Sequence, residues 1–154
     1  GNVAMACAFG GPLVEMKKHG SVLMTAEEQE AIGIREFDVI SVREQFADEY
    51  PELLAQFLQV TDRANKAYMK NPGKYQGTIA QAAGMELDAS NDMLSKFAFP
   101  TLDEQLSDAW MGGTVQSFTK EVADFFVDQG EMSNALDSYE PLIDASYLSK
   151  AKGM

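Results

Sequence analysis

The pattern of apolar and polar positions divides the chain into an alternating first third and a helical remainder. Short apolar runs at residues 3–9, 21–24 and 37–42 are bounded by turn residues, as is typical of short β-strands. Two segments with helix signals lie between them, at residues 13–18 and 25–33, the second with Thr25 as N-cap. This strand, helix, strand, helix, strand order indicates an α/β unit.

From residue 43 onward the periodicity is helical. Apolar residues at three- and four-residue spacing follow Pro51 and predict one long helix, which Asn71-Pro72-Gly73 interrupts. A helix-rich second part therefore follows the small α/β part. Further helix caps and breaks are predicted at Gly84, Asp88, Thr101, Gly112-Gly113 and Gly130.

Composition limits the classes of partner and cofactor. The 154 residues are 45% hydrophobic, which is enough for a core, and 24 acidic against 12 basic residues give a net charge of -12. Such a surface repels phosphate backbones, so we expect no nucleic-acid partner. No apolar run approaches the roughly 20 residues of a membrane-spanning helix. With one His and one Cys, no His/Cys metal cluster is available, and we expect no cofactor.

The first residues lead straight into an apolar run. No basic residues precede that run, so it does not have the pattern of a signal peptide. Because a predicted strand begins already at residue 3, we expect this chain to be a piece of a longer protein.

Catalytic motifs are largely missing from the sequence. The glycine pairs lack the spacing and the Lys-Ser/Thr of a phosphate-binding loop. His19 follows two lysines at a predicted helix end and is interpreted as a surface residue, and Cys7, in an apolar run, as a small core residue. We therefore expect a protein without enzymatic activity.

Phe9-Gly10-Gly11 is the first place with chemistry suited to a ligand. An aromatic side chain ends a predicted strand there, and two residues without side chains follow it. Ligands of open α/β sheets bind at the carboxyl ends of strands, and glycine lets them approach the backbone. A packed aromatic residue beside an ordinary turn is the alternative interpretation.

Asp38 is the second such place, because it interrupts the apolar run at residues 37–42. A carboxylate inside a strand is costly unless a partner neutralises it. That partner is either a protein cation such as Arg35 or the ammonium group of a bound ligand. The residues by themselves leave both interpretations open.

Several segments of the chain together resemble one known protein family. The segments are ACAFGG and GSVLMT within residues 2–25, IREFDV (34–39), FADEYPEL (46–53), FPTLDEQL (99–106) and ADFFVDQG (123–130). They resemble the periplasmic solute-binding proteins of taurine and aliphatic-sulfonate ABC transporters. The likeness spans most of the chain, but only the C-terminal half of such a protein.

The resemblance implies an α/β, two-lobed fold of which this chain forms a part. Residues 2–36 would belong to the second lobe, residues 37–42 would be a crossing strand, and residues 43–154 would form the helical C-terminal part of the first lobe. Helices that lack the sheet they normally cover expose apolar surface. Copies of the fragment are therefore expected to self-associate, unless the missing half is a separate chain.

The resemblance also implies a substrate-binding component of an ABC transporter, in the periplasm, with a membrane permease as partner. Many members have tryptophan where this chain has Phe9, and members have Asp at the position of Asp38, which suits a ligand ammonium. Phe9, Gly10, Gly11 and Asp38 are thus the expected ligand contacts, and the sulfonate contacts are expected in the missing half. An enzyme related to thiamine-pyrimidine biosynthesis, and an interaction fragment without a ligand, are the alternatives.

Overall fold

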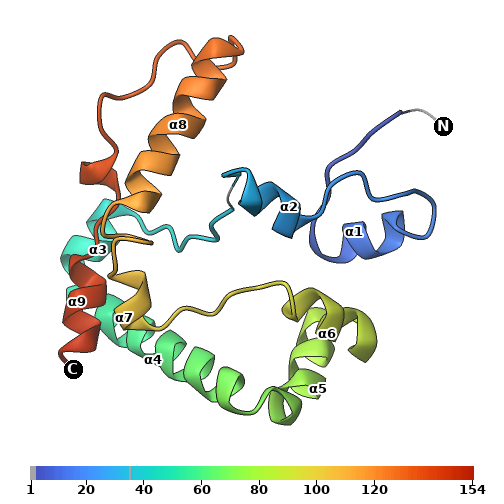
Figure 1. Ribbon diagram of the computed structural model, residues 1–154. Helices are drawn as coiled ribbons and strands as arrows, with labels where there is room; N and C mark the ends of the chain where they lie inside the picture. Colours follow the sequence, from blue (N-terminus) through green and yellow to red (C-terminus); the bar gives the residue numbers. More distant parts are fainter. Residues whose placement is uncertain (1–2, 35) are drawn as a thin grey trace. The chain divides into compact units, whose positions relative to one another are not determined.

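The computed structural model describes residues 3–34 and 36–154, which form two compact units. The first unit comprises described residues of 1–34 together with 67–98, and the second those of 35–66 together with 99–154. The elements, labelled in Figure 1, are α1 (Gly10–Met16), α2 (Ala26–Ala31), α3 (Glu44–Glu49), α4 (Pro51–Lys70), α5 (Pro72–Ala83), α6 (Leu87–Leu94), α7 (Leu102–Gln105), α8 (Thr114–Asp128), the 3-10 helix η1 (Glu140–Leu142) and α9 (Ser146–Lys152).

In the first unit, α6 packs against both α1 and α5. The helix ends here follow local signals that the sequence carries. The Thr25 hydroxyl accepts from the backbone N–H of Glu28, whose carboxylate accepts in turn from the N–H of Thr25. Gly84 ends α5 in the left-handed region at φ +64°, which favours glycine. Both predicted helix boundaries are confirmed.

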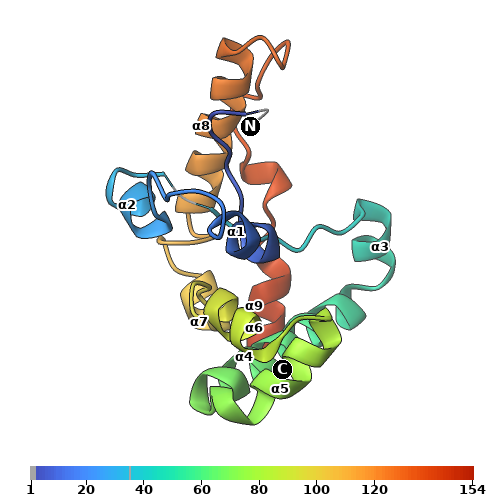
Figure 2. The same cartoon turned by 90° about the vertical axis from the view of Figure 1, so that its right-hand side faces the viewer.

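In the second unit, one face of α4 packs against α7 and α9, which lie side by side in Figures 1 and 2. Leu102 begins α7 and is buried between these helices. Partly buried Leu58, Leu106 and Met111 pack around the cluster. Its buried members are Ala55, Leu102, Leu148 and Ala151.

Little apolar side-chain volume is buried. Among the described residues nine apolar side chains are buried, and five of them are alanine, which removes little surface from water. Larger apolar residues stay accessible, among them Phe57 on α4 and Phe125 on α8, each more than half exposed. Apolar helix faces in this protein are therefore left without a covering partner.

The described residues contain helices but no β-strand, so the three predicted strands are not formed. A strand needs a neighbouring strand to pair its backbone N–H and C=O groups. The apolar side chains that were expected to be buried there are accessible, with Leu23 80% and Val39 67% exposed. The prediction of a helix-rich remainder is confirmed, whereas an α/β sheet is not seen.

Two helix predictions in the second half need correction. Asp88 is the second residue of α6 and not its N-cap, which is Glu86. The helix capped by Thr101 ends at Gln105, well before the predicted break at Gly112-Gly113, because the chain turns repeatedly between Ser107 and Gly113. In the described part of the chain, no helix combines the length and apolar character that crossing a bilayer requires.

Candidate functional site

Phe9, Gly10 and Gly11 lie at the start of α1 in the first unit. Phe9 is the N-cap residue in an extended conformation, and its side chain is 77% exposed. Gly10 has φ +61°, which favours glycine, and a Cβ there would lie 3.6 Å from the Met93 sulfur on α6. A Cβ at Gly11 would meet open space. The exposed Phe9 ring therefore lies beside two residues without side chains at the start of α1.

Asp38 lies in the second unit, in a segment outside any helix or strand, and its side chain is exposed. None of the ion pairs or hydrogen bonds found among the described residues involves Asp38. Arg35, the protein cation proposed as its partner, lies outside the described residues. No described residue pairs with the exposed Asp38 carboxylate, so a ligand cation could reach it.

The residue before Asp38 is anchored by aromatic contacts. The ring of Phe37 lies with its centroid 5.3 Å from that of Trp110, at an interplanar angle of 76°. A second ring, that of Phe118 on α8, lies 5.4 Å from Phe37 at 64°. Edge-to-face pairs of this kind are favourable beyond the area they bury. The rings therefore hold the backbone next to Asp38.

An apolar cavity of about 350 Å³ is lined in part by residues 40–42, which follow Asp38 in the sequence. Residues 40–42 form one wall, and side chains of α3 and α4 form the rest. Among the described residues of the lining, Ser41 is the sole polar one. A cavity so poor in polar groups suits an apolar contact better than a charged head group. Its lining residues are Ile40, Ser41, Val42, Phe46, Leu53, Leu54 and Phe57.

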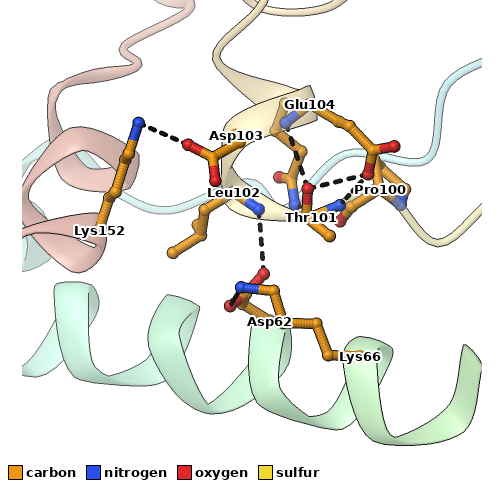
Figure 3. A network of polar contacts seen from close by, with 9 residues as sticks. Asp62, Lys66, Pro100, Thr101, Leu102, Asp103, Glu104 and Lys152 are labelled. Atoms are coloured by element: carbon orange, nitrogen blue, oxygen red, sulfur yellow. Dashed lines mark hydrogen bonds and ion pairs between the residues drawn. The ribbon is translucent and has the colours of Figure 1, made fainter. Parts of the chain in front are cut away.

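Sequence reasoning missed one polar residue that organises the second unit. Asp62 on α4 is only 5% exposed, and its carboxylate accepts from the backbone N–H of Leu102 at 3.0 Å and from the Lys66 ammonium at 2.6 Å (Figure 3). The available signal was its position, because Asp62 follows Leu54 and Leu58 at four-residue spacing on the buried face. A buried acid in that register needs partners from another element.

The first turn of α7, next to Asp62, carries two acidic groups with shifted pKa values. A hydrogen bond from Lys152, together with its positive charge, lowers the pKa of Asp103. Hydrogen bonds from Thr101, first from its backbone N–H and then from its hydroxyl, lower the pKa of Glu104 (Figure 3). Negative charge at a helix N-terminus also favours the helix dipole, so these groups stabilise α7 as anions.

Other candidate groups do not gather into a reactive site. Cys7 is exposed, which corrects its interpretation as a core residue, and His19 is exposed beside Glu15 at 3.7 Å. Within the described ranges, no three His, Cys, Asp or Glu side chains are close enough together to hold a metal ion. Phe9 with its two glycines in the first unit, and Asp38 in the second unit, therefore stay two separate candidate ligand contacts.

Comparison with known proteins adds one distant likeness. A taurine-binding periplasmic protein of Escherichia coli (strain K12) is 24% identical to the chain over 152 residues, which is 96% of this chain and 48% of the relative. The chain thus spans about half the length of this relative. No protein-family profile matches the chain, and no solved structure matches it. The likeness supports the class noted in the sequence, that of periplasmic solute-binding proteins.

Proposed function

We propose that this chain is the C-terminal half of a periplasmic solute-binding protein, the substrate-binding component of an ABC transporter for taurine or a related sulfonate. The observation that carries the proposal is the likeness that extends over 96% of the chain but covers 48% of the relative. A match of that extent supports half of a binding protein better than a shared short motif. The relative is named as a binding protein, which supports a function without catalysis.

In the complete protein, the fold would be α/β with two lobes. Residues 2–36 would join the second lobe, residues 37–42 would cross between lobes, and residues 43–154 would cover the first lobe with helices. The exposed apolar runs that form no strand here support this arrangement, because strands from the other half would supply their hydrogen-bond partners. The thin core and uncovered helix faces support it for the same reason.

The ligand would be held by its ammonium group at Asp38, with Phe9, Gly10 and Gly11 as further contacts. Asp38 supports this role through its exposed carboxylate, which has no partner among the described residues. A carboxylate and an ammonium form a charge-assisted hydrogen bond, which is stronger than a neutral one. Taurine carries both an ammonium and a sulfonate, and the residues for the sulfonate would come from the other half.

Transport would follow from closure of the lobes around the solute and docking of the closed form on a membrane permease in the periplasm. Lobe closure around a ligand is a common hinge motion of two-lobed binding proteins. The closed form presents a different surface from the open form, so a permease can distinguish loaded from empty protein.

Titration calorimetry of the native gene product that carries this chain tests the proposal. The ligands are taurine, ethanesulfonate as its analogue without the amine, and a thiamine-type aminopyrimidine. We expect saturable taurine binding that is tighter than ethanesulfonate binding. Binding of the pyrimidine without taurine would overturn the proposal in favour of the enzyme, and binding of none of the three would favour an interaction fragment.

A further inference from the structure

The turn between α7 and α8 carries Trp110 on a closely hydrogen-bonded backbone. The N–H groups of Trp110 and Gly112 both donate to the carbonyl of Ser107, at 3.0 and 2.9 Å. The Trp110 carbonyl then accepts from the N–H of Val115 in the first turn of α8, at 3.0 Å. These bonds fix the backbone at Trp110 relative to α8, so the indole has a rigid base.

Gly112 allows this turn to close. A Cβ at Gly112 would lie 2.8 Å from both the carbonyl carbon and the carbonyl oxygen of Ser107, closer than real Cβ atoms approach backbone. Any other residue would therefore push the turn apart and move Trp110. Of the glycine pair at residues 112–113, Gly112 is thus the residue that the close turn requires.

Phe37 rests on two rings, one from this turn and one from the following helix, α8. Its contacts to Trp110 and Phe118 are both edge-to-face, at 5.3 and 5.4 Å between centroids. Phe37 is half-buried, whereas Asp38 and Val39, which follow it, are exposed. The two ring contacts tie Phe37 to the turn before α8 and to α8 itself.

We propose that Phe37, Trp110 and Phe118 form an aromatic platform that positions the Asp38 carboxylate for a ligand ammonium. The inference rests on the proposed function, since it assigns positioning residues to the same site. Only the peptide unit between two adjacent α-carbons separates Phe37 from Asp38, so fixing the Phe37 ring restricts where the carboxylate can point. The platform acts through Phe37 and contacts no ligand in this role.

The test compares binding of taurine and of ethanesulfonate, which lacks the amine, by the native gene product and its variants. Asp38→Asn sets the reference for loss of amine recognition. We expect Phe37→Leu to weaken taurine binding about three- to tenfold and to leave ethanesulfonate binding nearly unchanged, from the strength of an aromatic pair. Phe37→Tyr keeps the ring and should restore the preference for taurine.

Phe125→Leu is the matched control. Phe125 lies on α8, as Phe118 does, and pairs edge-to-face with Phe126, but it is not part of the platform. The variant should change neither affinity. Equal weakening of both ligands by Phe37→Leu would overturn the positioning role and leave a structural one. If Asp38→Asn lost the preference for taurine over ethanesulfonate while Phe37→Leu kept it, the platform would be overturned and the role of Asp38 would stand. No effect of Asp38→Asn on taurine binding would overturn the role of Asp38 and the platform with it. No taurine binding by the unaltered protein would overturn the proposed function as well.

A measurement without ligand tests the platform independently. Trp110 is the single tryptophan of this chain, so the intrinsic fluorescence of this chain reports on the platform directly. Phe37→Leu should shift the Trp110 emission to longer wavelength and increase quenching by acrylamide, while Phe125→Leu should change neither. Emission and quenching that stay the same in Phe37→Leu would show that Phe37 does not rest on Trp110, and would overturn the inference.

Discussion

The carboxylate of Asp62 accepts a hydrogen bond from the backbone N–H of Leu102, which lies 40 residues further along the chain. The first N–H groups of a helix have no partner within the helix, and Leu102 is the first residue of α7. Asp62 supplies that partner from the buried face of α4, and Lys66 neutralises its other oxygen. Through this contact a single side chain joins two helices of the second unit.

Replacing Asp62 by alanine is expected to destabilise the protein by about 1–3 kcal/mol, because the buried N–H of Leu102 loses its acceptor. The free energy of unfolding in urea, followed by Trp110 fluorescence, measures the loss. Asp124→Ala is the matched control, since Asp124 pairs with Lys120 four residues away but is exposed, and it should cost at most about 0.5 kcal/mol. Similar losses in both variants would contradict the role of Asp62.

Glu104 is expected to contribute to stability in a pH-dependent way. Hydrogen bonds from Thr101 lower the pKa of Glu104 below its ordinary value of 4.5 in the folded protein. Its carboxylate therefore stabilises the folded state above pH 4.5, and this contribution is lost as the pH falls through the folded pKa. Glu104→Gln keeps an acceptor for the cap but does not titrate.

Urea unfolding of the parent protein and of Glu104→Gln, from pH 7 to pH 3, checks this prediction. The stability advantage of the parent over the variant should be constant near neutral pH and should shrink below pH 4.5. A difference that stays the same over the whole range would show that the Thr101–Glu104 contact has no electrostatic part.

Asp38→Asn is expected to weaken taurine binding by about ten- to a hundredfold, the value of a charge-assisted contact. Ethanesulfonate binding should change little, because that ligand has no amine. The free energy of unfolding without ligand should also stay the same. A large loss of stability in the absence of ligand would instead identify a protein cation, such as Arg35, as the partner of Asp38.

Self-association of the chain is expected to use the outer face of α4. Leu53, Phe57 and Val60 are each about half exposed, and their spacing of four and three residues places them on one stripe. Light scattering at tens of micromolar should detect oligomers, and Phe57→Gln should shift them toward monomer. Leu142→Gln, which changes an exposed leucine outside α4, should have no such effect. A parent chain that is monomeric would contradict the prediction.

Helix boundaries that depend on near neighbours could be predicted from the sequence. Thr25 and Thr101 each bond to the N–H three residues later, and Gly84 adopts the positive φ that the absence of a side chain permits. These interactions are complete within one turn, so residue types at fixed spacing determine them. Asp88 shows the limit of such prediction, because Glu86 and Asp88 both suit a helix start and the cap forms without a side-chain bond.

The strand predictions failed for a different physical reason. The runs at residues 3–9, 21–24 and 37–42 have the composition of strands, but a strand forms only against another strand. The candidate ligand contacts were predicted in the same partial way. Asp38 and Phe9 could be named as unusual residues, whereas their surroundings could not.

The sequence by itself determined the starts of α2 and α7 and the end of α5, because Thr25 and Thr101 bond to residues three positions away and Gly84 adopts a positive φ. Only the tertiary structure decided that Asp62 bonds to Leu102 and that Phe37 rests on Trp110 and Phe118. Those contacts join segments that are far apart in the sequence. The first requires α4 to pack against α7, and the second requires residue 37 to lie next to the start of α8. Residue type shows that a buried acid or an aromatic ring needs a partner, but the packing selects which one it meets.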